Sequence, residues 1–187
     1  MSRGKLVVIS APSGAGKTTI ARAVLAAFPA LRFSVSATTR PIRPNEVQRR
    51  DYIFLTREEF LRKVEAGEFV EWEEIYGDCY GTLKAVVERA LRGGGHILFD
   101  VDVKGGLSIK REYPDTCLIF LRPPRVEDLL ERLRNRKTEN PGTITRRMER
   151  VPMELALGAS FEHQVVNDTL ERAIKEVNGI VAAYLTN

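Results

Sequence analysis

Eight residues near the start of the chain have types and spacing suited to holding phosphate groups. The run Ala11-Pro-Ser-Gly-Ala-Gly-Lys17-Thr18 follows the pattern G-x-x-x-x-G-K-[ST], except that Ala11 stands where the first glycine is usual. Glycines let backbone N–H groups turn inward around phosphate oxygens, and the N-terminus of a following helix adds positive partial charge. We expect Lys17 to neutralise the β- and γ-phosphates of a nucleoside triphosphate and Thr18 to place its hydroxyl on Mg²⁺.

The elements around this loop alternate between short apolar runs and helical patterns. An apolar run at 6–10 predicts a buried strand before the loop, and the spacing at 17–28 predicts a helix after it. This alternation predicts an α/β fold of three layers, a parallel sheet with helices on both faces. The further predicted strands are 33–36, 97–102, 117–121 and 164–167, and the further predicted helices are 103–113, 126–136 and 169–184.

Two regions interrupt the alternation. Residues 38–95 are too long for a simple crossover and predict an inserted α+β lobe, with strands at 52–55 and 69–75 and helices at 57–66 and 83–92. Thr56 and Glu59 form a capping-box pattern at the start of the first of these helices. Residues 125–158 are rich in arginine and predict a helical lid, with a turn at 140–142. The core would then comprise residues 1–37, 96–124 and 159–187 of a single domain.

Composition limits the classes of protein to consider. The chain has 187 residues, 43% hydrophobic and 29% charged, with a net charge of +4. These values describe a globular chain with no membrane span and too little excess charge to indicate a nucleic-acid partner. The apolar run at the start continues into the glycine-rich loop, which favours a strand over a secretion signal. With only Cys79 and Cys117, we expect a reducing, cytoplasmic setting.

A second anion site is predicted in the inserted lobe. Arg40 and Arg43 lie on a segment interrupted by prolines, and Tyr52 follows it. Two guanidinium groups and a phenol hydroxyl can hold a dianionic phosphate through charge-assisted hydrogen bonds, although a solvated basic loop has the same composition.

Two acids mark the end of the strand predicted at 97–102. Asp100 and Asp102 are two residues apart, so both are expected on one face, at the edge where ligands bind in open α/β sheets. We expect Asp100 to hold Mg²⁺ directly or through water, with Thr18, and Asp102 to line the acceptor pocket. The alternative is that the two acids only cap the following helix.

Several motifs together resemble the guanylate kinase family over essentially the whole chain. They occur in the family's order and comprise the phosphate loop, Thr38-Thr-Arg40 with Arg43 and Glu46, Phe69-Val-Glu71-Trp72, Tyr80-Gly81-Thr82, Phe99-Asp-Val-Asp102 with Gly105, the arginine-rich lid, and Val166-Asn167-Asp168. The chain departs from the family pattern at Pro41-Ile42, Asn45, Arg49 and Lys137, which affects loop shape more than contacting groups.

The resemblance implies transfer of the γ-phosphate of ATP to GMP, with Mg²⁺ bound to ATP. It implies lid contacts from Arg136 and Arg147, with Lys17 the third catalytic residue. It implies an ATP site at Ala11, Pro12, Ser13, Gly14, Ala15, Gly16, Lys17, Thr18, Thr19 and Asn167, the last near adenine. It implies a GMP site at Ser36, Arg40, Arg43, Tyr52, Glu71, Tyr80, Thr82 and Asp102.

The chemistry of guanine agrees with two of these positions. Guanine presents N1–H and N2–H₂ as adjacent donors, which suit the carboxylate of Glu71, and O6 as an acceptor, which suits the hydroxyl of Thr82. Adenine has a lone pair at N1 that would face the charge of Glu71. A site built on such hydrogen bonds can reject the wrong base by roughly 10⁴–10⁵.

Three other functions share some of these features. Asp102-Val-Lys-Gly105 matches the D-x-x-G motif of GTPases, but no N-K-x-D motif occurs, so we exclude that class. A non-catalytic guanylate-kinase-like module would bind protein ligands, and such modules usually lack an intact phosphate loop. A related kinase would act on another phosphate ester; Arg40, Arg43 and Glu71 together argue against it.

Overall fold

The computed structural model describes residues 4–75, 77–135 and 141–186, and its main sheet is parallel throughout. The strands lie in the order β2 (Leu31–Phe33), β7 (His96–Asp100), β1 (Leu6–Ser10), β8 (Cys117–Arg122) and β9 (His163–Val166). All five residues of β1 are buried, as expected for a central strand covered on both faces. This order brings the carboxyl ends of β1 and β7 side by side.

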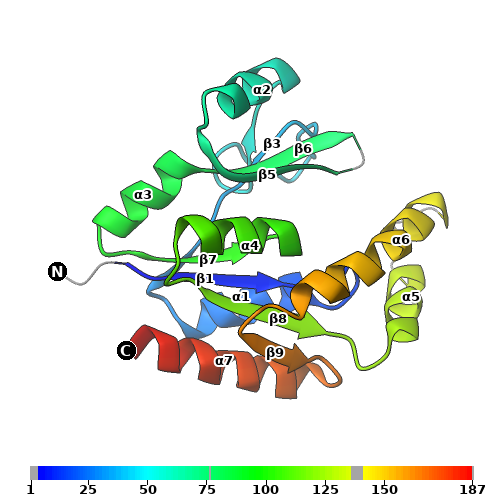
Figure 1. The fold of residues 1–187 in the computed structure, drawn as a ribbon. Coiled ribbons are helices and arrows are strands. Elements are labelled where there is room, and N and C mark those ends of the chain that lie inside the picture. The colour runs from blue at the N-terminus through cyan, green and yellow to red at the C-terminus, as the bar shows by residue number, and fades with distance from the viewer. Residues whose placement is uncertain (1–3, 76, 136–140, 187) are drawn as a thin grey trace.

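Helices cover both faces of this sheet, which confirms the predicted α/β class (Figure 1). On one face, α1 (Lys17–Ala27) and α7 (Leu170–Thr186) pack around Ile20, Val24 and Val177. On the other face, α3 (Lys84–Arg92) and α4 (Val103–Glu112) pack against Phe99 and the neighbouring strands. The two apolar layers hold the sheet edge that carries the phosphate loop.

A second sheet forms the lobe above the main body in Figure 1. Its strands lie in the order β4 (Ile53–Phe54), β3 (Ala37–Thr38), β6 (Asp78–Leu83) and β5 (Phe69–Ile75). Helix α2 (Arg57–Glu65) packs on it through the buried ring of Phe60, which stacks on Phe69. The capping box predicted at the start of α2 is present: the backbone N–H of Glu59 donates to the Thr56 hydroxyl, and the backbone N–H of Thr56 donates to the Glu59 carboxylate.

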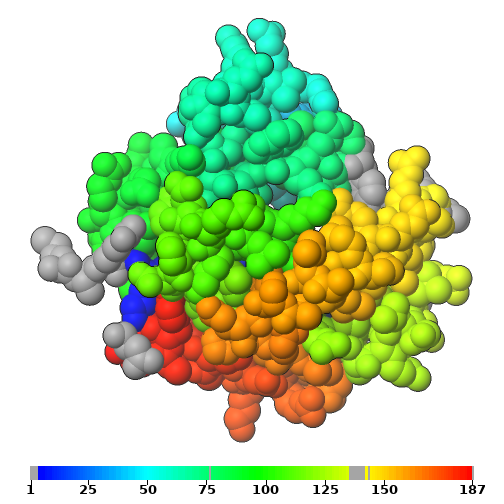
Figure 2. Space-filling model, viewed as in Figure 1, coloured from blue at the N-terminus to red at the C-terminus, as the bar shows by residue number. Residues whose placement is uncertain are grey.

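Two further helices flank the carboxyl edge of the main sheet. These are α5 (Val126–Asn135) and α6 (Pro141–Gly158). Figure 2 shows α6 beside α4 on the face toward the viewer, below the lobe. Because α6 passes close to the loop that follows β1, its side chains reach the phosphate loop. No helix within the described ranges is long and apolar enough to cross a bilayer.

The structure corrects several sequence-based expectations. The strand predicted at 33–36 is β2, and it ends at Phe33 because the chain then leaves the main sheet toward the lobe. Strands β3 and β6 were not predicted; β3 has only two residues and β6 contains a glycine, so neither shows a clear strand pattern. Of the turn predicted at 140–142, Asn140 lies outside the described residues, and Pro141 and Gly142 belong to the first helical turn of α6, since proline is well suited to the start of a helix.

Candidate active site

The loop between β1 and α1 has the backbone shape that its glycines allow. Gly14 and Gly16 have φ angles of 87° and 89°, a region that disfavours side chains, and the N–H of Ala15 donates to the carbonyl of Pro12 at 3.1 Å. Asn167 is buried after β9, and its Nδ2 donates to the Ala15 carbonyl at 2.7 Å. The shape of the loop is therefore stabilised by a residue that follows the edge strand β9.

The lysine of the loop lies against the strand-end carboxylate. Lys17 Nζ is 2.8 Å from Asp100 Oδ1 and donates to the Val101 carbonyl at 2.9 Å. Thr18 Oγ1 donates to Asp100 Oδ2 at 3.1 Å. The predicted juxtaposition of Thr18 with Asp100 is thus present, and the two oxygens are hard ligands of the kind that Mg²⁺ prefers.

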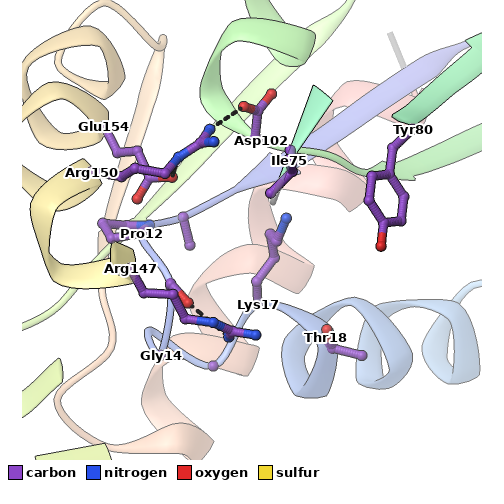
Figure 3. Close-up of a pocket in the computed structure, with 13 residues that line it drawn as sticks. Pro12, Gly14, Lys17, Thr18, Ile75, Tyr80, Asp102, Arg147, Arg150 and Glu154 are labelled. Atoms are coloured by element: carbon purple, nitrogen blue, oxygen red, sulfur yellow. Dashed lines mark hydrogen bonds and ion pairs between the residues drawn. The ribbon is translucent and has the colours of Figure 1, made fainter. Parts of the chain in front are cut away.

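A cavity of about 320 Å³ opens beside this loop (Figure 3). In Figure 3, Lys17 projects into the space between Arg147 and Tyr80, and Arg147 Nη1 donates to Ser13 Oγ at 3.1 Å. The cavity thus has cationic groups from the loop and from α6 on opposite sides. Its lining comprises Ala11, Pro12, Ser13, Gly14, Gly16, Lys17, Thr18, Ile75, Tyr80, Asp102, Arg147, Arg150 and Glu154.

An ion cluster at the rim joins three parts of the fold. Arg150 of α6 lies 3.1 Å from Glu73 of β5 and 3.1 Å from Asp102, and its Nε lies 3.6 Å from Glu154. Burial and the neighbouring Asp102 raise the pKa of Glu73 to about 7, although Arg150 opposes this shift. The cluster connects the lobe, the main sheet and α6 across the mouth of the cleft.

A second cavity of about 170 Å³ extends from the first toward the lobe. Lys17, Ile75, Tyr80 and Asp102 line both, so the two spaces are neighbours around the lysine. This cavity contains four carboxylates and Lys17 as its one basic group, which suits a ligand with hydrogen-bond donors. Its lining comprises Lys17, Ser36, Tyr52, Glu71, Glu73, Ile75, Tyr80, Gly81, Asp100, Val101 and Asp102.

Glu71 and Thr82 face each other across β5 and β6. The Thr82 hydroxyl donates to Glu71 Oε1 at 2.6 Å, and the two residues are register partners. Burial is the main reason that the pKa of Glu71 rises to about 7, with the Thr82 hydrogen bond opposing it. A Cβ on Gly105 would meet Glu71 Oε2 at 3.0 Å, so this glycine leaves room for the carboxylate.

The arginines predicted to bind phosphate are organised by Glu46. Arg40 Nη1 and Nη2 donate to the two carboxylate oxygens of Glu46 at 2.9 and 2.7 Å, and the Arg43 backbone N–H donates to Glu46 Oε2 at 2.9 Å. The hydrogen bond from Arg40 lowers the pKa of Glu46 to about 2. The guanidinium of Arg40 also lies 5.1 Å from the ring centroid of Tyr52.

The structure brings most predicted site residues to these cavities. Ser36, Tyr52, Glu71, Tyr80 and Asp102 line the second one. Arg43 lines a neighbouring space of about 520 Å³ that also includes Thr18, Tyr52 and Asp100. Thr82 does not line the second cavity but bonds to Glu71, which does, and Thr19 is exposed on α1. Asp102 also caps α4 by accepting from the N–H of Gly105 at 2.8 Å. Arg136 lies outside the described residues.

Sequence reasoning did not assign roles to Arg150, Glu154 or Glu73. Arg150 and Glu154 are four residues apart on α6, a spacing that signals an intrahelical ion pair but not its position at a cleft. Glu73 lies two residues after Glu71, on the same face of β5. Asn167, predicted near adenine, is seen to support the loop; its contact with adenine stays a prediction.

A glycine-rich P-loop after the first strand of a parallel sheet, opening onto a second cavity beneath a smaller lobe, is the arrangement of a P-loop kinase. The guanylate kinase family model matches residues 3–184. The guanylate kinase of Rubrobacter xylanophilus is 46% identical over 95% of this chain and 93% of its own length. That of Chlorobium luteolum is 45% identical over 98% of this chain and 93% of its own length. The crystal structure of guanylate kinase from Anaplasma phagocytophilum has a TM-score of 0.79 at 28% identity and covers 100% of this chain and 88% of that one. The chain belongs to the guanylate kinase family.

Proposed function

We propose that this enzyme transfers the γ-phosphate of ATP to GMP, giving ADP and GDP, with ATP in the 320 Å³ cavity and GMP in the 170 Å³ cavity. The observation that carries the assignment is the pair of Glu71 and Thr82 on a cavity that shares Lys17 with the phosphate loop. The donor groups of guanine would meet Glu71, and O6 would accept from Thr82.

The acceptor phosphate would lie among Ser36, Arg40, Arg43, Tyr52 and Tyr80. Glu46 holds Arg40 and the backbone of Arg43 in place before substrate arrives. A planar guanidinium and phenol hydroxyls suit a phosphate dianion. The phosphate of a nucleoside monophosphate is already mostly dianionic at neutral pH, because its second pKa is about 6, so the attacking oxygen needs no general base.

One residue at the end of β7 and one at the start of α1 fit a magnesium ion. Thr18 and Asp100 provide a hydroxyl and a carboxylate whose oxygens lie 3.1 Å apart, and both are hard oxygen ligands. When bound, Mg²⁺ would neutralise charge on the β- and γ-phosphates of ATP. Lys17, now paired with Asp100, would then be free to contact those phosphates.

The remaining catalytic work is positioning and charge neutralisation, as in other phosphoryl transfers. Lys17 from the phosphate loop and Arg147 from α6 would offset the charge on the transferred phosphoryl group, and Arg136 would join them from the lid. We propose that residues 38–95 form the GMP lobe and residues 125–158 the lid. Their closure would exclude water that would otherwise hydrolyse ATP. The setting we propose is the cytoplasm, where Cys79 and Cys117, both free, would stay reduced.

A coupled assay of ADP release tests this assignment. GMP, dGMP, AMP, UMP and ribose 5-phosphate are offered as acceptors with ATP and Mg²⁺. We expect turnover with the guanine nucleotides and rates lower by at least about 10³ with AMP and UMP. Equal rates with AMP would contradict the guanine assignment, and no turnover with any acceptor would support the protein-binding module.

A further inference from the structure

The first half of helix α6, which carries Arg147, has little anchoring in the core. The side chains from 144 to 150 are exposed or half-buried; Met148 packs against the main core, but none of them is buried. The buried residues described in α6 all lie in its second half and are Val151, Glu154 and Gly158. Arg147 nevertheless reaches Ser13 of the phosphate loop. A charge that must meet a reacting group needs a fixed position, so further contacts have to hold this half.

A proline separates the two halves of α6. Pro152 lies inside the helix and has no N–H, so the hydrogen bond that this position would donate to the carbonyl of Met148 is missing. Helices bend most readily where such a bond is absent. The half that carries Arg147 is therefore joined to the better-buried half by a weakened turn, and its orientation depends on contacts of its own.

Arg150 makes such contacts from the turn that follows Arg147. Its Nη2 donates to both carboxylate oxygens of Glu73 at 3.1 Å and to Asp102 Oδ2 at 3.1 Å. Its Nε lies 3.6 Å from the carboxylate of Glu154. These four side chains are between 8% and 23% exposed, so water screens the cluster less than it screens an ion pair on the open surface.

The guanidinium of Arg150 also separates carboxylates that would otherwise repel one another. Glu73 belongs to β5 of the lobe, Asp102 to the start of α4, and Glu154 to α6. Lys104 lies 3.7 Å from Glu73, but its side chain is 54% exposed and it contacts only this member of the cluster. Without Arg150, repulsion among the three carboxylates would favour separation of α6 from the lobe.

We propose that Arg150 is a positioning residue, which holds Arg147 against the phosphate loop by anchoring α6 to the lobe and to the main sheet. Figure 3 shows the two arginines leaving the same helix, Arg150 toward Asp102 and Arg147 toward the loop. Glu73 lies two residues after Glu71 on the same face of β5, so the anchor joins the strand that would select the base to the helix that would stabilise the transferred group. This inference rests on the proposed function, which assigns Arg147 to the transferred phosphoryl group.

Steady-state kinetics at saturating ATP and GMP test this role. We expect Arg150→Met to lower kcat by about tenfold, because Arg147 would be displaced. Arg150→Lys keeps the charge but not the planar group that bridges two carboxylates, and it should lose less. In an Arg147→Met background, Arg150→Met should change kcat by less than about twofold, since the group that it positions is already absent. Effects that multiply in the double variant, or an unchanged kcat in Arg150→Met, would overturn the proposal.

Two further variants guard against misfolding and a general effect of lost charge. Glu73→Gln weakens the anchor from the lobe without leaving a carboxylate unpaired, and it should lower kcat in the same direction by a smaller factor. The matched control is Arg57→Met. Arg57 also pairs with a carboxylate of β5, that of Glu74 at 2.7 Å, but on the opposite face of the strand, so kcat should not change. An equal loss in Arg57→Met and Arg150→Met would also overturn the proposal.

A measurement without nucleotide separates this inference from the proposed function. Trp72, the single tryptophan of the chain, is 44% exposed on β5 beside Glu73 and can donate energy to a dye on Glu149→Cys, an exposed position of α6. The two native cysteines are buried, so they would not take the dye. We expect less energy transfer in Arg150→Met and no change in Arg57→Met. Equal transfer with and without Arg150 would overturn the anchor, whereas lack of turnover with GMP in the unmodified protein would contradict the proposed function instead.

Discussion

The phosphate loop and the proposed GMP lobe both have groups suited to anions, but they are built differently. The loop uses backbone between a fully buried strand and a helix, and Asn167 fixes it from the far end of the sheet. The lobe uses long arginine side chains on irregular backbone between β3 and β4, where Glu46 holds the side chain of Arg40 and the backbone of Arg43. The first site is therefore set by the core, whereas the second is set by ion pairs near the surface.

Because of this difference, we expect substitutions in the loop and substitutions in the lobe to affect different properties of the enzyme. Changes in the loop should reduce the rate of transfer or the stability of the fold without altering which base is accepted. Changes in the lobe should alter affinity for the acceptor and its selection while leaving the fold intact.

The largest effect is expected for Lys17→Ala. Removing the one ammonium group shared by both cavities should lower kcat by about 10³, since a preorganised charge at the transferred group is lost. Steady-state kinetics with ATP and GMP measure this effect. Lys63→Ala, which removes a surface ion pair with Glu68, should leave kcat unchanged. A comparable loss in both variants would contradict the special role of Lys17.

Next in size is Gly16→Ala. The residue has a positive φ, and an added Cβ would lie 2.6 Å from Asn167 Nδ2. We expect a loss of at least about 2 kcal/mol in the free energy of unfolding, measured with urea. Gly67→Ala is the control, since φ is also positive there but the surrounding space is open, and it should cost about 1 kcal/mol. Equal losses would show that the contact with Asn167 does not matter.

On the acceptor side, Glu46→Gln should raise KM for GMP by about tenfold, the effect of weakening one charge-assisted hydrogen bond, with little change in kcat. The reason is that the neutral amide keeps only one of the two acceptor oxygens, so Arg40 loses the charge and one of the hydrogen bonds that hold it. Glu74→Gln breaks an exposed pair with Arg57 elsewhere on the lobe and should leave KM unchanged. An effect on kcat alone would place Glu46 outside the acceptor site.

The smallest effect is a pH dependence. Glu71 has a pKa of about 7 in the ligand-free protein, raised by burial, and must be ionised to accept from guanine. Affinity for GMP, measured by titration calorimetry, should therefore rise several-fold between pH 6 and about pH 8. Stability should change in the opposite direction: the folded form holds the proton more tightly than the unfolded form, so this group lowers stability as pH rises from about 4.5 to about 7. Glu73→Gln should shift the affinity profile slightly to lower pH, because the charge of Glu73 helps to raise the pKa of Glu71, whereas Glu71→Gln should flatten it.

The same contrast explains what the sequence could predict. The loop, its flanking strand and helix, and the pairing of Asp100 with Thr18 follow from a contiguous motif and from the parallel order of the strands. The alternation of apolar runs and helical patterns was sufficient for the α/β class, because buried strands have a strong pattern.

The acceptor side was harder to predict without a family resemblance. Its residues come from the segments before and after β3, from β5 and β6, and from the turn that follows β7; β3 and β6 have no clear strand pattern of their own. The partnership of Glu46 with Arg40 and of Arg150 with Glu73 depends on tertiary placement, and charged residues in loops or on helix surfaces give no such signal. Spacing in the sequence therefore identifies local sites better than sites assembled from distant segments.

Base selection by Glu71 is the claim on which the account most depends. The direct measurement is the ratio of kcat/KM for GMP to kcat/KM for AMP in the unmodified enzyme and in Glu71→Gln, with thermal unfolding to confirm that the variant folds. We expect the ratio to fall by at least about 10², because the amide presents a donor where guanine also presents donors. An unchanged ratio in a folded variant would contradict the assignment of this cavity to guanine.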